Sequence, residues 1–317
     1  MKFYIKIFSS IALFTLALYL LDINKMISIL NGYSTINLIF AILVNIFMYI
    51  LLSVRWHLII KKQTEFLLIR NISIYLKGTY YSFFTPSNIG GDIYRYFKYK
   101  KIKKILLISL LILERLIGFL TYIIFYILSF VIIFFMGNKI SLSHGYYLIP
   151  FLLSTSLLLI IITYLKFNFI NNLFNKIIIK IINILNLKTK IIINYFNLRF
   201  SPEHDWNGII VFSILSFILV VFGFQIISIG LGVKIPITHT ILVLTLVEII
   251  RFIPITVQGI GLREGSYALL MTHLGHNSEE VYLVALFAYL AISLAIVICG
   301  LISILIKTNY NRISKLF

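Results

Sequence analysis

The longest apolar run in the sequence, Ile105–Met136, limits what the chain can fold into more than any other feature. Glu114 and Arg115 are the only charged residues in it. As one α-helix the run would extend about 48 Å, whereas the hydrocarbon core of a bilayer is about 30 Å thick. The whole chain is 61% hydrophobic and 12% charged, against about 45–50% and about 25% in soluble domains. We therefore predict an all-α polytopic membrane protein.

Six segments are long and apolar enough to cross a bilayer. We expect Glu114-Arg115 to divide the longest run, so that only its second part crosses. The first apolar run should be retained as a helix, because no small-residue cleavage site follows it. The predicted spans are Ile5–Leu21, Ile36–Val54, Leu116–Met136, Tyr147–Leu165, Gly208–Leu231 and Val281–Ile306.

Two polar breaks, Thr85–Arg95 and Arg251–Glu264, interrupt this apolar sequence with prolines, glycines and charged residues. At membrane depth such non-helical chain must be buried in protein or line a cavity. Basic residues flank Asn71–Tyr99 on both sides, which predicts a re-entrant hairpin from the cytoplasmic side. For Ile237–Leu274 the sequence leaves two alternatives, full crossing or a second re-entrant pair. The chain is therefore expected to have six to eight transmembrane helices, including two broken or re-entrant pairs.

The order of these elements is the same in residues 1–137 and 146–307, starting from opposite faces of the membrane. Transporters built from inverted repeats place broken helices at corresponding positions near the substrate. Inverted repeats and two unrelated helix breaks both remain open as interpretations. The longest mostly polar or basic interval, Lys166–Trp206, is also rich in apolar residues. Its part Lys166–Arg199 has six bases and no acid, which is typical of one or two amphipathic helices on the inner membrane surface. We therefore treat 1–317 as a single integral membrane domain.

The net charge of +18 comes from lysines and arginines that lie between the hydrophobic spans. This pattern follows the positive-inside rule and predicts cytoplasmic N- and C-termini, with no nucleic-acid partner. The six histidines lack metal-binding spacing, and the single Cys299 excludes an intramolecular disulfide. We expect no metal and no cofactor.

Four of the ten acids lie in or beside apolar sequence with an arginine as neighbour. An isolated charge at the bilayer centre costs about 2.5–3.5 kcal/mol, so these sets should face each other, water or a ligand. Partners three residues apart can pair on one helix face, whereas adjacent residues point apart and should reach other segments. The four sets are Asp92 with Arg95, Glu114 with Arg115, Glu248 with Arg251, and Glu264 with Arg263.

The planar donor fork of arginine suits the phosphate of a lipid headgroup. Glycines in the breaks would let backbone N–H groups approach the same anion. The alternative is that the charged pairs lock helices together or mark the membrane boundary. This alternative is strongest for Glu114 and Arg115, whose side chains could snorkel at the inner headgroup level. The candidate lipid-binding residues are Asn88, Gly90, Gly91, Asp92, Arg95, Glu114, Arg115, Glu248, Arg251, Gly259, Gly261, Arg263 and Glu264.

Three separated motifs, Pro86–Arg95, Glu114–Leu116 and Pro254–Gly265, resemble the lysylphosphatidylglycerol synthase transmembrane family, also described as the flippase-like domain family. The resemblance implies a membrane domain that moves a lipid between leaflets. Full-length synthases add a soluble C-terminal aminoacyltransferase domain. This chain ends at Phe317, so we expect a stand-alone member without the synthase activity.

The hypothesis that follows is a plasma-membrane lipid translocase in cell-envelope lipid or polysaccharide biogenesis, and a transporter rather than an enzyme. Its ligand would be an anionic phospholipid or a polyprenyl-phosphate-linked glycan. Two alternatives stay open. One is a membrane-embedded transferase that adds a glycosyl or aminoacyl group to a lipid, and the other is a non-catalytic partner in an envelope assembly.

Overall fold

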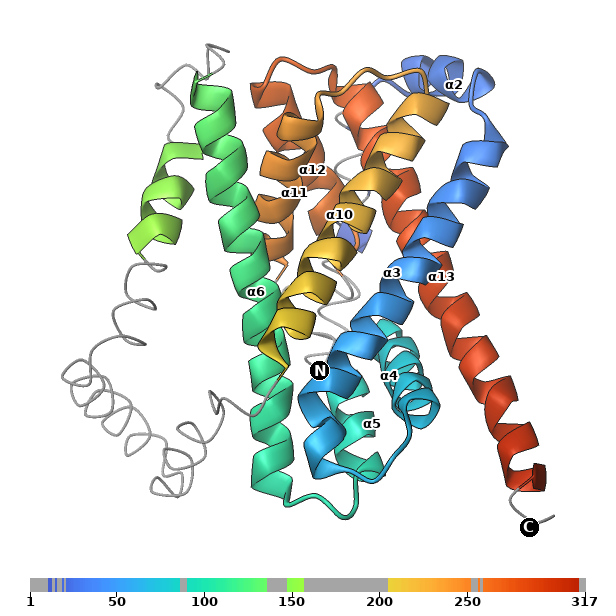
Figure 1. Ribbon diagram of the computed structural model, residues 1–317. Helices are drawn as coiled ribbons and strands as arrows, with labels where there is room; N and C mark the ends of the chain where they lie inside the picture. The colour runs from blue at the N-terminus through green and yellow to red at the C-terminus, as the bar shows by residue number, and fades with distance from the viewer. Residues whose placement is uncertain are drawn as a thin grey trace.

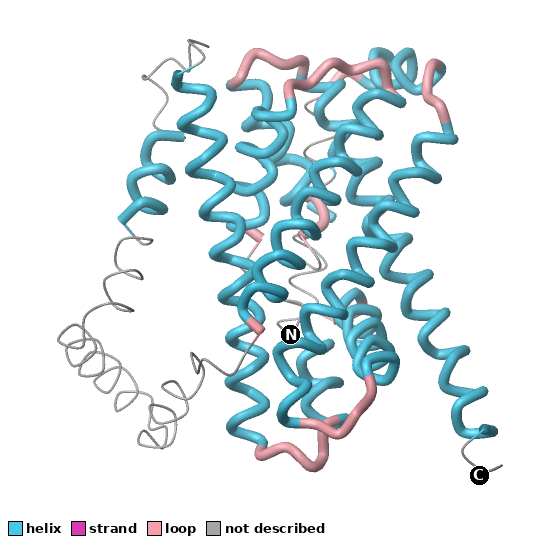
Figure 2. Tube along the Cα trace, in the orientation of Figure 1, coloured by secondary structure: helices cyan, strands magenta, loops and turns pink. Residues whose placement is uncertain are grey.

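The computed structural model describes residues 11, 12, 15, 19, 21–85, 90–135, 147–156, 205–251, 256 and 259–313. Within these ranges every regular element is a helix, and most of the connecting loops lie at the two ends of the molecule (Figure 2). The prediction of an all-α polytopic fold is confirmed. Most of the predicted span Ile5–Leu21, residues 157–165 of the predicted span Tyr147–Leu165, and nearly all of the basic interval Lys166–Trp206 lie outside the described residues.

Four of the described helices are long and apolar enough to cross a membrane. They contain the spans predicted at 36–54, 116–136 (up to Phe135), 208–231 (up to Gly230) and 281–306, and most extend past the predicted ends. A short helix, α2 (Ile23–Asn31), precedes the first of them. The four long helices are α3 (Thr35–Ile60), α6 (Lys104–Phe135), α10 (Trp206–Gly230) and α13 (Ser278–Ile313).

Helix α6 corrects one prediction, because it runs unbroken past Glu114 and Arg115. The division expected there does not occur. Glu114 is only 4% exposed, and it faces buried arginines rather than lipid or headgroups. A charge that is compensated inside the protein does not have to end an apolar helix.

Two pairs of shorter helices form the hairpins of the fold. The first pair is α4 (Leu68–Phe83) with α5 (Gly90–Lys98), and the second is α11 (Ile237–Ile250) with α12 (Leu262–His273). These helices have 16, 9, 14 and 12 residues, so at about 1.5 Å per residue none exceeds about 24 Å. Each falls short of a bilayer core, which favours two re-entrant pairs over full crossings.

The hairpins lie at opposite ends of the molecule, α4–α5 at the bottom and α11–α12 at the top of Figure 1. Each half of the fold therefore consists of a long helix, a hairpin and a second long helix. The first half runs from α3 to α6 and the second from α10 to α13, and α3 packs against α10. The hairpins also pack across the halves, α4 on α13 and α11 on α6. This order is the one expected for inverted repeats, and it directs both hairpin tips toward the middle of the fold.

Apolar packing surrounds this middle region. One cluster of buried residues joins α10, α11, α12 and α13, and another joins α3, α4 and α6. In the second cluster the Trp56 indole donates to the Tyr99 hydroxyl, which donates to the Asn71 side chain, both at 3.0 Å. These three side chains thus satisfy one another's hydrogen bonds, as buried polar groups require.

Candidate functional site

A cavity of about 690 Å³ lies at the tips of the two hairpins and between the long helices. Residues from both polar breaks line it, so the two breaks face one shared space. Among the described residues five arginines and four acids line the cavity. They are Arg55, Asp92, Arg95, Glu114, Arg115, Glu248, Arg251, Arg263 and Glu264.

The first charge network joins α3, α5 and α6 through alternating signs. Glu114 on α6 accepts from Arg95 on α5 at 2.5 Å, and it lies 3.5 Å from Arg55 on α3. Arg95 also donates to Asp92 at 2.6 Å, and Asp92 in turn pairs with Arg115. Because the signs alternate, each acid is shared by two arginines, which compensates charges that burial would otherwise penalise.

Aromatic side chains support the centre of this network. The Arg95 guanidinium lies 4.5 Å from the Trp56 ring and 5.1 Å from the Tyr75 ring. Such contacts stabilise a desolvated guanidinium by cation–π attraction. On the far side, Arg55 donates to the Ser213 hydroxyl of α10 at 3.2 Å. The network thus ties the first hairpin to both halves of the protein.

The first hairpin is held closed by side chains at the end of α4. Thr85 and Ser82 accept from the backbone N–H groups of Gly90 and Gly91, each at 2.9 Å. A Cβ atom at Gly91 would overlap the carbonyl of Gly78, so only glycine permits this approach of α5 to α4. The Gly90 and Gly91 donors are therefore engaged within the chain, and neither residue is among those that line the cavity.

The second charge network belongs to the α11–α12 hairpin. Glu248 on α11 pairs with Arg251 at 3.0 Å and lies 4.0 Å from Arg263 at the start of α12. The Arg263 guanidinium lies 4.8 Å from the ring of Tyr289 on α13. Side chains of Glu248 and Arg263 are each 8% exposed. This network therefore links the second hairpin to a spanning helix.

Glycines shape the second break as well. Gly259 and Gly261 have φ of 81° and 78°, a region that glycine enters without steric cost. The Gly261 N–H donates to the Glu264 carboxylate at 2.8 Å, which caps the first turn of α12. Gly259 lines the cavity, whereas Gly261 is not among the lining residues.

The pairing expected from sequence spacing is largely confirmed. Partners three residues apart, Asp92 with Arg95 and Glu248 with Arg251, do pair locally. The adjacent Glu114 and Arg115 reach separate partners, as Arg263 also does. One expectation was wrong, because Glu264 caps its own helix instead of reaching another segment. The alternative that placed Glu114 at the headgroup level does not hold either, since this residue is buried. Asn88 lies outside the described residues.

Arg55 is the main cavity residue that the sequence analysis missed. Its position after the predicted end of a span suggested a basic loop, but α3 continues to Ile60 and buries it to 6% exposure. The apolar residues Trp56 and Leu58–Ile60, which follow Arg55, could have indicated from the sequence that the helix continues past Val54. Ser213 and the cavity-lining Tyr289 had no signal of this kind, since both lie in ordinary apolar helix sequence.

Among the described residues that line the cavity, three buried donors have no hydrogen-bond partner, the Nε atoms of Arg55 and Arg263 and the hydroxyl of Tyr289. Buried polar groups are almost always paired, so such groups at a cavity are suited to a ligand. Arg251 and Arg115 are the more accessible cations, with side chains 28% and 40% exposed. No cluster of three or more metal-ligating side chains occurs in the part of the chain that the structure describes.

The family comparison agrees with this architecture. No curated protein and no solved structure matches the chain. The model of the family described as "Lysylphosphatidylglycerol synthase TM region" matches residues 4–300. That match covers both hairpins, both charge networks and nearly all of the spanning helices. The chain belongs to the lysylphosphatidylglycerol synthase TM region family.

Proposed function

We propose that this protein is a lipid translocase that binds the anionic headgroup of its lipid in the shared cavity. The observation that carries the proposal is that both hairpin tips, which come from opposite ends of the molecule, line one charged cavity. A lipid that changes leaflets must move its polar headgroup past the hydrocarbon core. A polar intramembrane cavity lowers the cost of that step.

The charges of the cavity favour an anion. Five arginines and four acids line it among the described residues, which leaves a formal excess of one positive charge. Guanidinium groups bind phosphate through two parallel hydrogen bonds. The unpartnered Arg263 Nε and Tyr289 hydroxyl add two donors. A phospholipid phosphate or a polyprenyl phosphate offers the acceptors that these donors need.

The two hairpins suggest how the headgroup would gain access from each side. Each hairpin carries one charge network at its tip, and each network connects that hairpin to a spanning helix of the fold. Opening one network while the other stays closed would expose the cavity to one leaflet at a time. Alternating access of this kind is the usual behaviour of inverted-repeat transporters.

The lower end of the molecule in Figure 1 carries the basic connections, including Lys61, Lys62 and Lys98–Lys104. Under the positive-inside rule this end would face the cytoplasm. The α4–α5 hairpin would then open to the inner leaflet and the α11–α12 hairpin to the outer one. With the same orientation the end of α13 faces the cytoplasm. The proposal includes a cytoplasmic N-terminus, as the positive-inside rule predicts, and residence in the plasma membrane, where the protein would serve cell-envelope lipid biogenesis.

Purified protein in liposomes tests the proposal. Wild type should accelerate leaflet exchange of a labelled anionic lipid, with phosphatidylglycerol, cardiolipin and a polyprenyl phosphate as the probes. Arg251→Ala should slow exchange by about tenfold or more, because a charge-assisted contact to phosphate contributes about 1.5–3 kcal/mol. Lys101→Ala is the matched control, since this lysine is 79% exposed and pairs with Glu65 rather than lining the cavity.

Failure of wild type to accelerate exchange of all three probes would contradict the proposal. Equal rates for Arg251→Ala and Lys101→Ala would contradict the assigned cavity. Mass spectrometry of the same liposomes, incubated with activated sugar or aminoacyl donors, should show unmodified lipid. A new modified lipid would favour the transferase alternative instead.

A further inference from the structure

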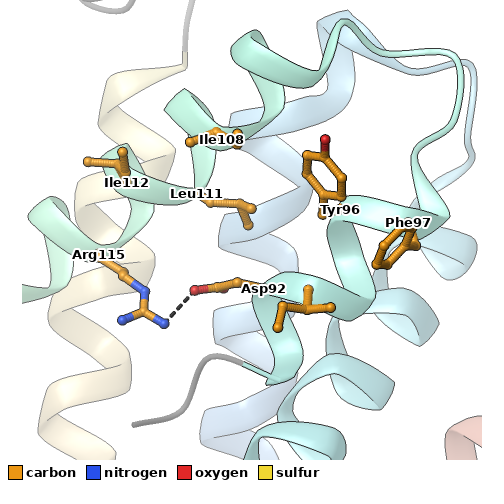
Figure 3. Close-up of a pocket in the computed structure, with 8 residues that line it drawn as sticks. Asp92, Tyr96, Phe97, Ile108, Leu111, Ile112 and Arg115 are labelled. Carbon is orange, nitrogen blue, oxygen red and sulfur yellow. Dashed lines mark hydrogen bonds and ion pairs between the residues drawn. The ribbon is translucent and has the colours of Figure 1, made fainter. Parts of the chain in front are cut away.

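A second hollow, outside the central cavity, lies between α5 and α6 and has a volume of about 490 Å³ (Figure 3). Its walls are apolar. Ile93 and Phe97 come from α5, and Ile108, Leu111 and Ile112 come from α6. We call this hollow the α5–α6 groove.

One ion pair separates the groove from the cavity. Asp92 and Arg115 line both spaces, and Figure 3 shows their side chains directed toward one another at the end of the groove. The apolar α5–α6 groove and the charged cavity therefore meet at the Asp92–Arg115 pair. A molecule with an apolar tail and an anionic head would match these two neighbouring surfaces.

We propose that the α5–α6 groove holds an acyl chain of an anionic membrane lipid, and that the Asp92–Arg115 pair is the gate between the groove and the cavity. The inference rests on the proposed translocase function and adds a binding place for the lipid tail beside the cavity. Arg115 would hold the headgroup phosphate at the gate, while the tail remains in the groove.

The exposure of the groove walls supports a lipid chain as the occupant. Phe97 is 64% exposed, Ile93 51% and Ile108 45%, and α6, which carries Ile108, is long and apolar enough to cross a membrane. From Ile108 to Arg115 the groove follows α6 for about 10 Å at about 1.5 Å per residue. An extended hydrocarbon chain can lie along this length with its phosphate beside the guanidinium.

The most solvent-exposed pair of the first charge network is the one at the gate. Side chains of Arg115 and Asp92 are 40% and 20% exposed, whereas those of Arg95 and Glu114 are 10% and 5% exposed. Exposed ion pairs contribute less to stability than well-formed buried ones, whose disruption strands a charge. When the gate opens, Asp92 keeps its 2.6 Å bond from Arg95. The gate can therefore open without leaving a carboxylate uncompensated.

Photo-crosslinking tests the groove without requiring transport. The full-length protein in liposomes is mixed with phosphatidylglycerol or phosphatidylcholine that carries the same diazirine-labelled acyl chain. Labelled residues are then mapped by mass spectrometry. Phosphatidylglycerol should label Ile108 and Ile112 about fivefold more than phosphatidylcholine does, the factor expected for one basic residue near an anionic headgroup. Ile124 and Leu128, exposed to a similar extent on α6, should show no such preference.

Two variants sharpen the result. Arg115→Gln should remove the preference for phosphatidylglycerol in the groove while leaving labelling of Leu128 unchanged. Ile112→Trp should fill the groove and reduce its labelling with both lipids, whereas Leu128→Trp should not. Melting temperatures measured for each variant identify any that fail to fold, and the wild-type comparison of the two lipids stands without them.

Equal labelling of Ile108 and Leu128, with no headgroup preference at either, would overturn the groove inference. Groove labelling with the expected preference, but no leaflet exchange by wild type, would keep the groove and reject the translocase function. Leaflet exchange by wild type without preferential groove labelling would keep the translocase function and reject the groove.

Discussion

Arg95 on α5 donates a hydrogen bond to Glu114 on α6 across 2.5 Å, with side chains only 10% and 5% exposed. This contact fixes the tip of a re-entrant hairpin to a spanning helix. Arg55 reaches the same carboxylate from α3. Three separate helices thus depend on one acid, which makes the network a structural element as well as a candidate binding site.

Glu114→Gln should therefore destabilise the fold strongly. The substitution leaves two buried guanidiniums facing an uncharged amide, and breaking a buried ion pair costs about 3–5 kcal/mol. Thermal unfolding in detergent should show a large drop in melting temperature. Glu65→Gln is the control, because Glu65 and its partner Lys101 are 82% and 79% exposed. An unchanged melting temperature for Glu114→Gln would show that the network is not structural.

The closeness of α4 and α5 gives a second prediction. In Gly91→Ala the added Cβ would overlap the Gly78 carbonyl and the Ser82 hydroxyl, so the helices must separate. Overpacking of this kind costs about 1–3 kcal/mol. Gly265→Ala is the matched control, because nothing lies within 4 Å of a Cβ there. It should be neutral or should stabilise α12 by up to about 1 kcal/mol. Equal melting temperatures for the two variants would contradict the close approach.

Much of the fold follows from sequence because membrane helices obey simple rules. Apolar length predicts α10 and α13, and the proline and glycine content of the breaks predicts two hairpins. Spacing of three residues predicts the Asp92–Arg95 pair correctly. These features depend on local sequence, which is why they could be predicted.

Other features depend on contacts between distant segments. Arg55 and Glu114 looked like membrane-boundary charges until the structure placed them 3.5 Å apart, on α3 and α6. Only that pairing lets both helices continue through charged positions. The Asp92–Arg115 contact likewise needs the packing of α5 on α6. No periodicity in the sequence encodes such contacts, so the extent of α6 was predicted wrongly and Arg55 was missed.

Glu264 caps the first turn of α12 and also lines the cavity. Glu264→Gln keeps a side-chain oxygen that can accept from the Gly261 N–H, so stability should change little. Glu264→Ala loses the cap and should cost about 1 kcal/mol. If the charge serves transport, both variants should alter the rate of leaflet exchange. Normal exchange by a folded Glu264→Gln would limit this residue to capping.

A histidine pair at the upper end of the molecule gives a pH-dependent prediction. The Nδ1 of His239 lies 2.9 Å from the Nε2 of His276, which follows α12 in the turn before α13. This contact needs at least one neutral ring, because protonation of both would oppose two positive charges. Burial lowers the pKa of His276 below its ordinary 6.5. At a pH between the lowered pKa of the folded protein and the ordinary pKa of the unfolded chain, the unfolded chain binds a proton at His276 that the folded chain does not. Stability therefore falls as the pH falls.

Wild type should therefore lose stability as the pH falls below about 7, by at most about 1.4 kcal/mol per pH unit for this group. His276→Gln removes the titrating group but keeps an amide that can bond to His239. Its free energy of unfolding should vary less over the same range, and the difference between the two proteins should be largest at the acidic end. Parallel pH profiles for wild type and His276→Gln would show that this contact does not respond to protonation.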